Sequence, residues 1–104
     1  MSKVLDWEID DYVAVQYEFL WYPGKIISME DDMFKVSCLE YVDKFQHVNK
    51  FRWPSRYDVK QYDRDELLLK LEEPMEINTK RLKYFVLNDD DFKDAGDVLR
   101  LVLK

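Results

Sequence analysis

The chain has 104 residues, of which 47% are hydrophobic, and it carries a formal net charge of -6 at pH 7. This composition fits one domain with a packed core and excludes a disordered tail. The sequence has no apolar run long enough to cross a membrane and no signal-peptide pattern. Its single cysteine, Cys38, excludes an internal disulfide, so we expect a soluble intracellular protein.

Residues 10–72 are typical of β structure. The alternation over residues 12–17 places Val13, Val15 and Tyr17 on one strand face. In chain order we predict strands over residues 12–17, 21–29, 33–41, 50–53 and 67–71, with a polar turn at 30–32 and a tight helical turn at 63–66. Five short strands joined by short links predict a small five-stranded barrel, since closure of the sheet removes most exposed edges.

The pattern changes after Pro74, where helical spacing replaces alternation. Residues 88–91 supply N-cap candidates and the acidic side chains that favour the positive end of a helix. The apolar residues that follow are spaced as on one helix face: Phe92, Ala95, Val98, Leu99 and Val102. We predict an amphipathic helix over residues 90–103 that packs on the barrel. The barrel then covers residues 1–74, and residues 75–104 are a C-terminal extension within the same domain.

The chemistry needed for catalysis is missing from the sequence. His47 is the only histidine and Cys38 the only thiol, and Cys38 shares a strand face with Phe34 and Val36, which predicts an inert core position. No ligand spacing indicates a metal site, and two glycines in the chain are too few for a phosphate-binding loop. We therefore predict a protein that is not an enzyme and that has no metal and no cofactor.

Aromatic residues crowd one predicted hairpin and carry a family resemblance. The motif in the second strand is Trp21-Tyr22-Pro23-Gly24-Lys25-Ile26, and the next strand follows as Met33-Phe34-Lys35-Val36-Ser37-Cys38. Residues 13–71 resemble Tudor-like, SH3-type barrels of the chromatin-reader group. The later residues are similar to a version of this barrel near the ends of transposon-derived animal proteins: Phe51, Arg52, Trp53, Pro54, Asp58, Tyr62, Asp65, Leu67 and Leu68. The resemblance makes the expected fold an SH3-like, Tudor-type barrel with a C-terminal α-helix.

Tudor domains that read methylated Lys or Arg hold the ligand in an aromatic cage at one end of the barrel. Matched position by position, the resemblance implies Tyr17 as the first wall and Tyr22 as the second, with Trp21 as its neighbour. Glu40 falls at an acidic position, and Tyr41 or Phe45 supplies a last wall. The third-strand aromatic falls on Cys38, a departure that leaves the cage weak, shifted or absent.

Our first functional hypothesis is a nuclear, chromatin-associated module that binds methylated Lys or Arg peptides such as histone tails. Ring faces attract cations, and an acidic chain attracts cationic partners. The alternative is a purely structural role, in which large aromatic residues fill the core. This core-packing alternative concerns Trp21, Phe34, Phe51 and Trp53.

Two further hypotheses stay open. A scaffold module would bind an unmodified peptide or a protein subunit through Phe19, the loop at 42–48 or the helix; Phe19 lies in a turn and is either a surface contact or packed on the C-terminal segment. A nucleic-acid module would use the local excess of cations: Lys44, Lys50, Arg52, Arg56 and Lys60. The negative net charge disfavours the nucleic-acid module. We expect no membrane partner, and open strand edges or the helix could make a homodimer.

Overall fold

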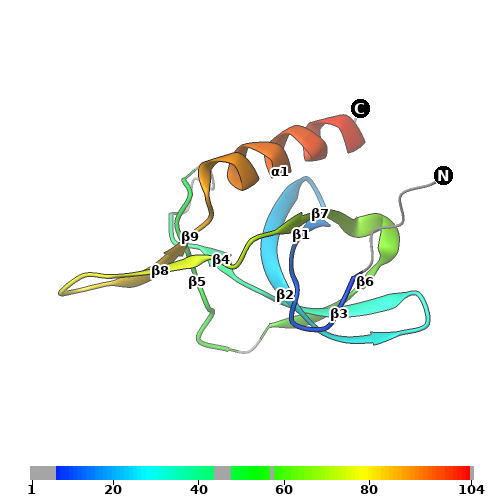
Figure 1. The fold of residues 1–104 in the computed structure, drawn as a ribbon, viewed down its shortest axis with the longest axis horizontal. Coiled ribbons are helices and arrows are strands. Elements are labelled where there is room, and N and C mark those ends of the chain that lie inside the picture. Colours follow the sequence, from blue (N-terminus) through cyan, green and yellow to red (C-terminus); the bar gives the residue numbers. More distant parts are fainter. Residues whose placement is uncertain (1–6, 44–47, 57, 104) are drawn as a thin grey trace.

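A computed structural model describes residues 7–43, 48–56 and 58–103 and contains two antiparallel sheets and one long helix (Figure 1). The elements in chain order are β1 (Tyr12–Tyr17), β2 (Leu20–Glu30), β3 (Met33–Cys38), β4 (Glu40–Tyr41), β5 (Phe51–Arg52), β6 (Val59–Asp63), the 3-10 helix η1 (Arg64–Glu66), β7 (Leu67–Leu71), β8 (Met75–Asn78), β9 (Lys83–Val86) and α1 (Asp89–Val102). The described chain is therefore mainly β, as predicted.

The first sheet has the strand order β6-β3-β2-β1-β7 and contains most of the predicted strands. The bounds of β1 and β7 agree with the prediction, and so does the tight turn before β7. That turn is η1, where the backbone N–H of Asp63 donates to Glu66 Oε1 at 2.8 Å. The prediction missed β6, and it was wrong to give residues 50–53 a place in this sheet, because β5 belongs to the second one.

The expected closed barrel is also wrong in one respect, because the described strands form two sheets that do not close into one barrel. The second sheet has the order β4-β5-β9-β8. The predicted strand over 33–41 divides at Leu39, whose N–H donates to the Pro23 carbonyl at 2.8 Å. Beyond Leu39, Glu40 and Tyr41 pair with β5 instead of continuing along β2. The chain thus passes from one sheet to the other within a single residue.

The first sheet is buried on both faces, and each face has its own core. The inner core contains Trp7, Val13, Val15, Ile26, Phe34, Val36, Cys38, Tyr62 and Leu67. The outer core contains Ala14, Trp21, Leu39, Tyr41, Phe51, Leu71, Leu87, Ala95 and Leu99. Successive side chains of a strand point to opposite faces, so Val13 and Val15 enter the inner core while Ala14 enters the outer core. The inner core confirms the strand face predicted for Val13 and Val15.

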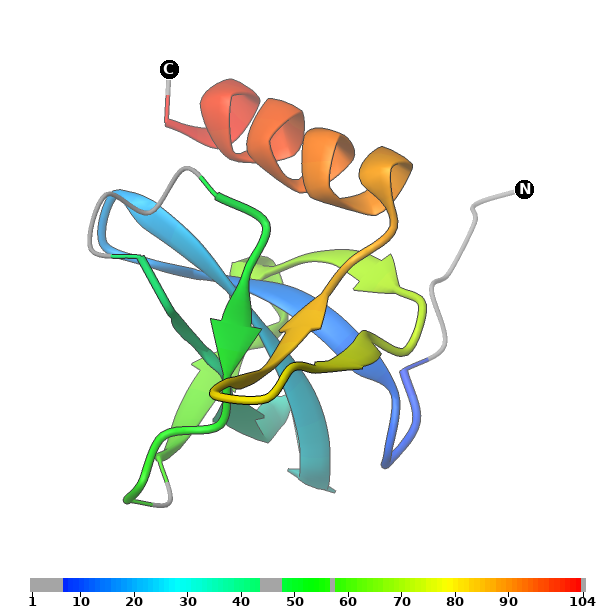
Figure 2. The same cartoon turned by 90° about the vertical axis from the view of Figure 1, so that its left-hand side faces the viewer.

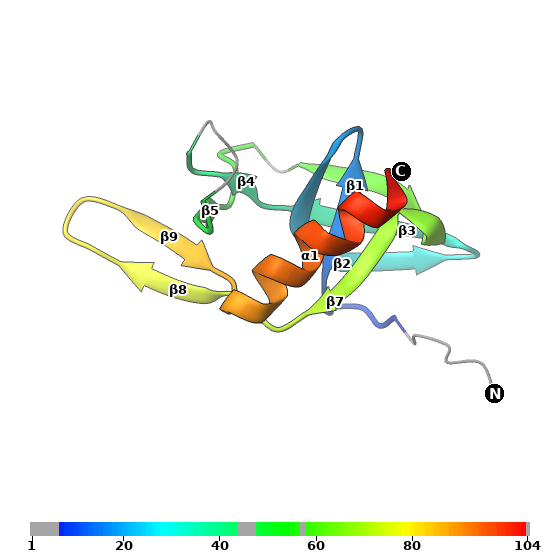
Figure 3. The ribbon, with the colours of Figure 1, turned by 90° about the horizontal axis from the view of Figure 1, so that it is seen from above.

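Helix α1 packs against β7 and β2 (Figure 2) and covers the outer core, and the β8–β9 hairpin projects to one side (Figure 3). The Asp91 N–H donates to Asn88 Oδ1 at 2.7 Å, which caps the helix. Ala95 and Leu99 are buried, and the Phe92 ring lies 5.6 Å from the Trp21 ring. The predicted helix and its packing on strands are confirmed. No helix in the described part of the chain is long and apolar enough to cross a membrane.

Candidate functional site

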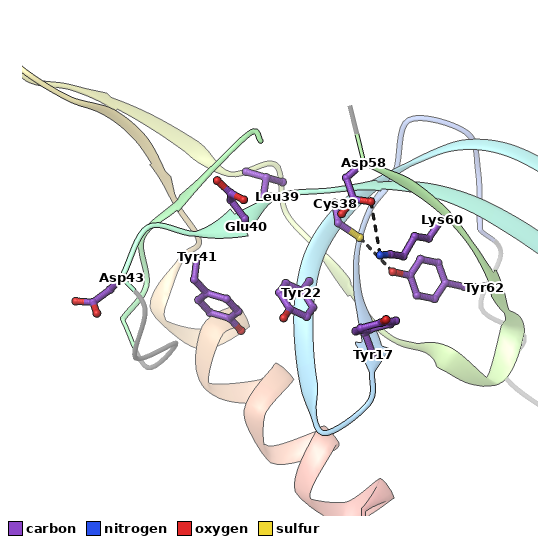
Figure 4. Close-up of a pocket in the computed structure, with 10 residues that line it drawn as sticks. All are labelled: Tyr17, Tyr22, Cys38, Leu39, Glu40, Tyr41, Asp43, Asp58, Lys60 and Tyr62. Atoms are coloured by element: carbon purple, nitrogen blue, oxygen red, sulfur yellow. Dashed lines mark hydrogen bonds and ion pairs between the residues drawn. The ribbon is translucent and has the colours of Figure 1, made fainter. Parts of the chain in front are cut away.

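One cavity of about 340 Å³ collects several of the side chains expected to form a cage (Figure 4). We call it the tyrosine pocket, and its lining is Tyr17, Tyr22, Cys38, Leu39, Glu40, Tyr41, Asp43, Asp58, Lys60 and Tyr62. Strand pairing explains why these residues meet. Tyr22 pairs with Val15 across β1 and β2, and Lys60 pairs with Val36 across β3 and β6. Directly opposite residues share a sheet face, so the pocket continues the inner-core face of the first sheet to its edge.

Three tyrosine rings stand next to one another along this pocket. The rings of Tyr17 and Tyr22 are 6.5 Å apart at 65°, and those of Tyr22 and Tyr41 are 5.4 Å apart at 61°. The Tyr41 hydroxyl donates to the Trp21 carbonyl at 2.5 Å, which fixes that ring. Tyr17 is 43% exposed and Tyr41 only 8%. The row of rings therefore runs from a buried, fixed wall to an open one.

Among the described residues of the lining, acidic side chains outnumber basic ones. Glu40 Oε2 accepts from Arg52 Nε at 2.6 Å, and Asp58 Oδ1 lies 3.7 Å from Lys60 Nζ. Asp43 adds a third carboxylate to the pocket. Lys60 and the neighbouring Arg52 offset two of these three carboxylates, which leaves one formal negative charge among the described residues and a modest preference for a cationic ligand over an anionic one.

The buried side chains at the floor of the pocket are uncharged and include no reactive nucleophile. The Cys38 sulfur lies 3.5 Å from the Tyr62 hydroxyl, and burial is the main cause that raises the pKa of the Cys38 thiol to about 11. A neutral thiol is a poor nucleophile at physiological pH. Burial also raises the pKa of Tyr22, Tyr41 and Tyr62 above the ordinary phenol value. The three phenols are therefore neutral, and the negative charge comes from the carboxylates alone.

Cys38 stands where the resemblance placed a third-strand aromatic, but a neighbouring strand supplies a ring at that depth. Tyr62 on β6 lies against Cys38 and is 3% exposed. Sequence reasoning missed Asp43, Asp58, Lys60 and Tyr62 as pocket residues. The available signal was the spacing of Asp58, Lys60 and Tyr62, since every second residue of a strand shares a face.

The structure places two other expected cage residues elsewhere. Trp21 is 7% exposed and belongs to the outer core, with its ring 5.9 Å from the Phe51 ring. Consecutive strand residues face opposite ways, so a pocket position for Tyr22 directs Trp21 away from it. Trp21 is thus a core-packing residue, as the structural alternative expected. Phe45 lies outside the described residues.

The remaining candidates are spread over different surfaces. Phe19 is 78% exposed between β1 and β2, so it is a surface residue and is not packed on the C-terminal segment. Of the cations considered for nucleic acid, Arg52 is paired with Glu40, and Lys50 lies 5.2 Å from the centre of the Tyr84 ring. Arg56 is exposed. Lys60 belongs to the tyrosine pocket, and Lys44 lies outside the described residues.

Within the described ranges, no three His, Cys, Asp or Glu side chains are grouped so that they could hold a metal ion. Comparison of the chain with models of protein families, with curated proteins and with solved structures found no match. The function must therefore be inferred from the pocket and the surface of this chain.

Proposed function

We propose that the protein is a non-catalytic binding module that reads methylated Lys or Arg in a cationic peptide. The observation that carries this proposal is that Tyr17, Tyr22 and Tyr41 line one cavity whose charged side chains are mostly acidic. Under this proposal the module is nuclear and chromatin-associated, and its partner is a peptide like a histone tail. It needs no cofactor and no metal.

The strand order supports a Tudor-type, SH3-like assignment for the first sheet. β1, β2, β3 and β6 follow one another across the sheet, and β7 then returns beside β1 after the η1 turn. An SH3-type barrel has the same path, with its fifth strand beside its first. In this assignment, the first sheet corresponds to the domain of transposon-derived proteins, and β4 with β5 and the β8–β9 hairpin are an addition to that sheet.

The expected affinity of the pocket alone is low. A cation within about 6 Å of a ring centre gains roughly 0.5 to 2 kcal/mol per ring, with the larger values in desolvated sites. Three rings then supply a few kcal/mol, and a binding free energy of about 4 kcal/mol corresponds to a millimolar dissociation constant. A methylated ammonium is bulky and poorly hydrated, so it suits such a pocket, but flanking peptide contacts must provide the remaining affinity.

The test is an NMR titration of the ¹⁵N-labelled protein with matched unmodified, methyl-lysine and methyl-arginine histone-tail peptides. We expect the methylated peptides to shift the amide signals of Tyr17, Tyr22 and Glu40, while the indole signal of Trp21 changes less. Tyr17→Ala should abolish the methylation preference. Phe19→Ala is the matched control, because it removes an exposed ring outside the pocket. Shifts that avoid the pocket, or a methylation preference that survives Tyr17→Ala, would rule out the proposal.

A second candidate function is a scaffold that binds an unmodified chain or a second copy of itself. Phe19 is 78% exposed and Leu101 on α1 is 69% exposed, and apolar side chains so open to water are typical of contact surfaces. This function predicts that Phe19→Ala or Leu101→Ser weakens partner binding or dimerisation in sedimentation experiments while Tyr17→Ala does not. Binding that depends steeply on salt and is lost with Arg56→Gln would instead indicate nucleic acid.

A further inference from the structure

Among the described residues, Lys60 is the only basic side chain in the lining of the tyrosine pocket, and its position is unusual for its strand. It pairs with Val36, and two residues further on Tyr62 pairs with Phe34. All three of these neighbours are buried in the inner core. The alternation of β6 therefore directs the Lys60 side chain toward a face where an apolar residue is the usual occupant.

The ammonium of Lys60 already occupies a cation position in this pocket. Its Nζ lies 4.8 Å from the centre of the Tyr17 ring, inside the range of a cation–π contact. The same atom lies 3.7 Å from Asp58 Oδ1 (Figure 4). Lys60 thus has the two partners, a ring face and a carboxylate, that the proposed function assigns to the ammonium of a ligand.

We infer that Lys60 is a built-in competitor that holds the cation position over Tyr17 and sets how tightly the pocket binds a cationic ligand. The inference rests on the proposed function, because it names the residue that a ligand ammonium must displace. The Lys60 side chain is 42% exposed, so its head can leave toward water without disturbing the buried neighbours of its stem.

Displacement has a definite physical consequence. A ligand ammonium and Lys60 cannot share the face of Tyr17, because like charges at this separation repel. The cost of moving Lys60 is the same for every cationic ligand, so it lowers all their affinities by one factor. Only a ligand with a strong gain in the pocket, such as a poorly hydrated methylated ammonium, then binds measurably. A neutral ligand of the same shape is not repelled by the Lys60 ammonium.

The test uses tetramethylammonium chloride as the probe and Lys60→Met as the variant, because Met keeps an apolar stem and removes the ammonium. Lys35→Met is the matched control, since it removes the same charge from an exposed position on the neighbouring strand. Titrations followed by NMR at constant ionic strength should show about tenfold tighter binding by Lys60→Met than by the wild type. We expect Lys35→Met to stay within about twofold of the wild type, since screened surface charges act weakly. tert-Butanol, the neutral probe of similar shape, should bind both proteins equally.

A second measurement tests the resting contact without any ligand. The Hε protons of Lys60 should resonate upfield of those of Lys35, because they lie near the face of the Tyr17 ring, and Tyr17→Leu should remove the difference. If Lys60→Met binds tetramethylammonium no better than Lys35→Met does, Lys60 is not a competitor and the inference fails.

The remaining outcomes separate this inference from the proposed function. If Lys60→Met binds tetramethylammonium tightly but the wild type binds no methylated peptide, the competitor stands and the peptide-reading function fails. If the wild type reads methylated peptides and Lys60→Met changes nothing, the function stands and the competitor fails. If neither protein binds the probe, the pocket is not a cation site and both fail.

Discussion

Trp21 and Tyr22 are consecutive residues of β2, yet they belong to two aromatic clusters that share only Tyr41 and differ in what surrounds them. Trp21 packs with Phe51 and Phe92 beneath α1, at ring distances of 5.9 and 5.6 Å. Tyr22 stands between Tyr17 and Tyr41 at similar ring distances, but these rings line a cavity with carboxylates. Ring spacing alone therefore does not distinguish a core from a candidate binding site. The difference lies in the hydroxyl groups, the nearby charges and the presence or absence of a covering helix.

The comparison predicts that substitutions in the outer core cost far more stability than the same substitutions at exposed rings. Phe51 is fully buried, so Phe51→Ala should cost about 3 to 5 kcal/mol of unfolding free energy. Phe19→Ala, which truncates a ring that is 78% exposed, should cost less than about 0.5 kcal/mol. Urea denaturation of both variants measures the difference. Phe51→Leu provides a milder second variant, and equal losses at the two positions would contradict the burial pattern.

The floor of the tyrosine pocket should behave like the core when the pH rises. The pKa of Cys38 is raised to about 11 in the folded protein, so the unfolded chain loses its thiol proton first. The stability that this thiol contributes is fully present below the unfolded pKa, near 8.5, and is lost as the pH rises toward 11. The loss is about 1.4 kcal/mol per pH unit, or roughly 3 kcal/mol in all.

Denaturation at a series of pH values, compared with Cys38→Ala, checks this prediction. The tyrosine and lysine side chains titrate in both proteins, so the difference between wild type and variant isolates the thiol. That difference should shrink between pH 8.5 and 11. A difference that stays constant over this range would show that the thiol is not desolvated.

Two glycines sharpen the comparison further, because an added methyl group would clash at Gly24 and would make only ordinary van der Waals contacts at Gly96. A Cβ at Gly24 would lie 2.5 Å from Val36 Cγ1 and 3.0 Å from the Ser37 carbonyl oxygen. Gly24→Ala should therefore cost about 1 to 3 kcal/mol through overpacking. A Cβ at Gly96 on α1 would meet nothing closer than 3.8 Å. Gly96→Ala should stabilise the protein by up to about 1 kcal/mol. In thermal unfolding, the melting temperature should therefore fall for Gly24→Ala and rise for Gly96→Ala.

A small stability effect is also expected at the open end of the pocket. Tyr17 is 43% exposed and its main ring contact is the edge contact with Tyr22. Tyr17→Ala should change the unfolding free energy by no more than about 0.5 kcal/mol, as measured by urea denaturation. A loss of several kcal/mol would mean that this ring is structural, and the contrast between the two clusters would disappear.

Much of the fold could be predicted from the sequence, and the misses have local causes. β1, β7, η1 and α1 follow from alternation, a capping pattern and helical spacing. β6 was missed because the inward-facing Lys60 interrupts the apolar alternation of its strand. The end of β3 was missed because the turn at Leu39 depends on a hydrogen bond to Pro23, which is distant in sequence.

The candidate site was predictable only in part, for a related reason. Tyr17, Tyr22, Glu40 and Tyr41 were found through the family resemblance, and they meet in one cavity. Trp21 was misplaced because β2 is buried on both faces, so hydrophobicity cannot tell which of two adjacent rings points to the pocket. Asp58 and Lys60 were grouped by charge along the chain, whereas the strand pairing that brings Lys60 to Tyr17 involves residues far apart in sequence.

The position of α1 also has a consequence for the order of events on the ribosome. The outer core joins Ala14 and Trp21, which are synthesised early, to Ala95 and Leu99, which are synthesised late. Chain synthesis adds roughly 5 to 20 residues per second, so the outer face of β1 and β2 stays uncovered for several seconds until α1 has been synthesised. During that interval an apolar sheet surface is open to water and to chaperones. Synonymous codons that slow translation before residue 89 would lengthen the exposure, and the yield of soluble protein should fall accordingly.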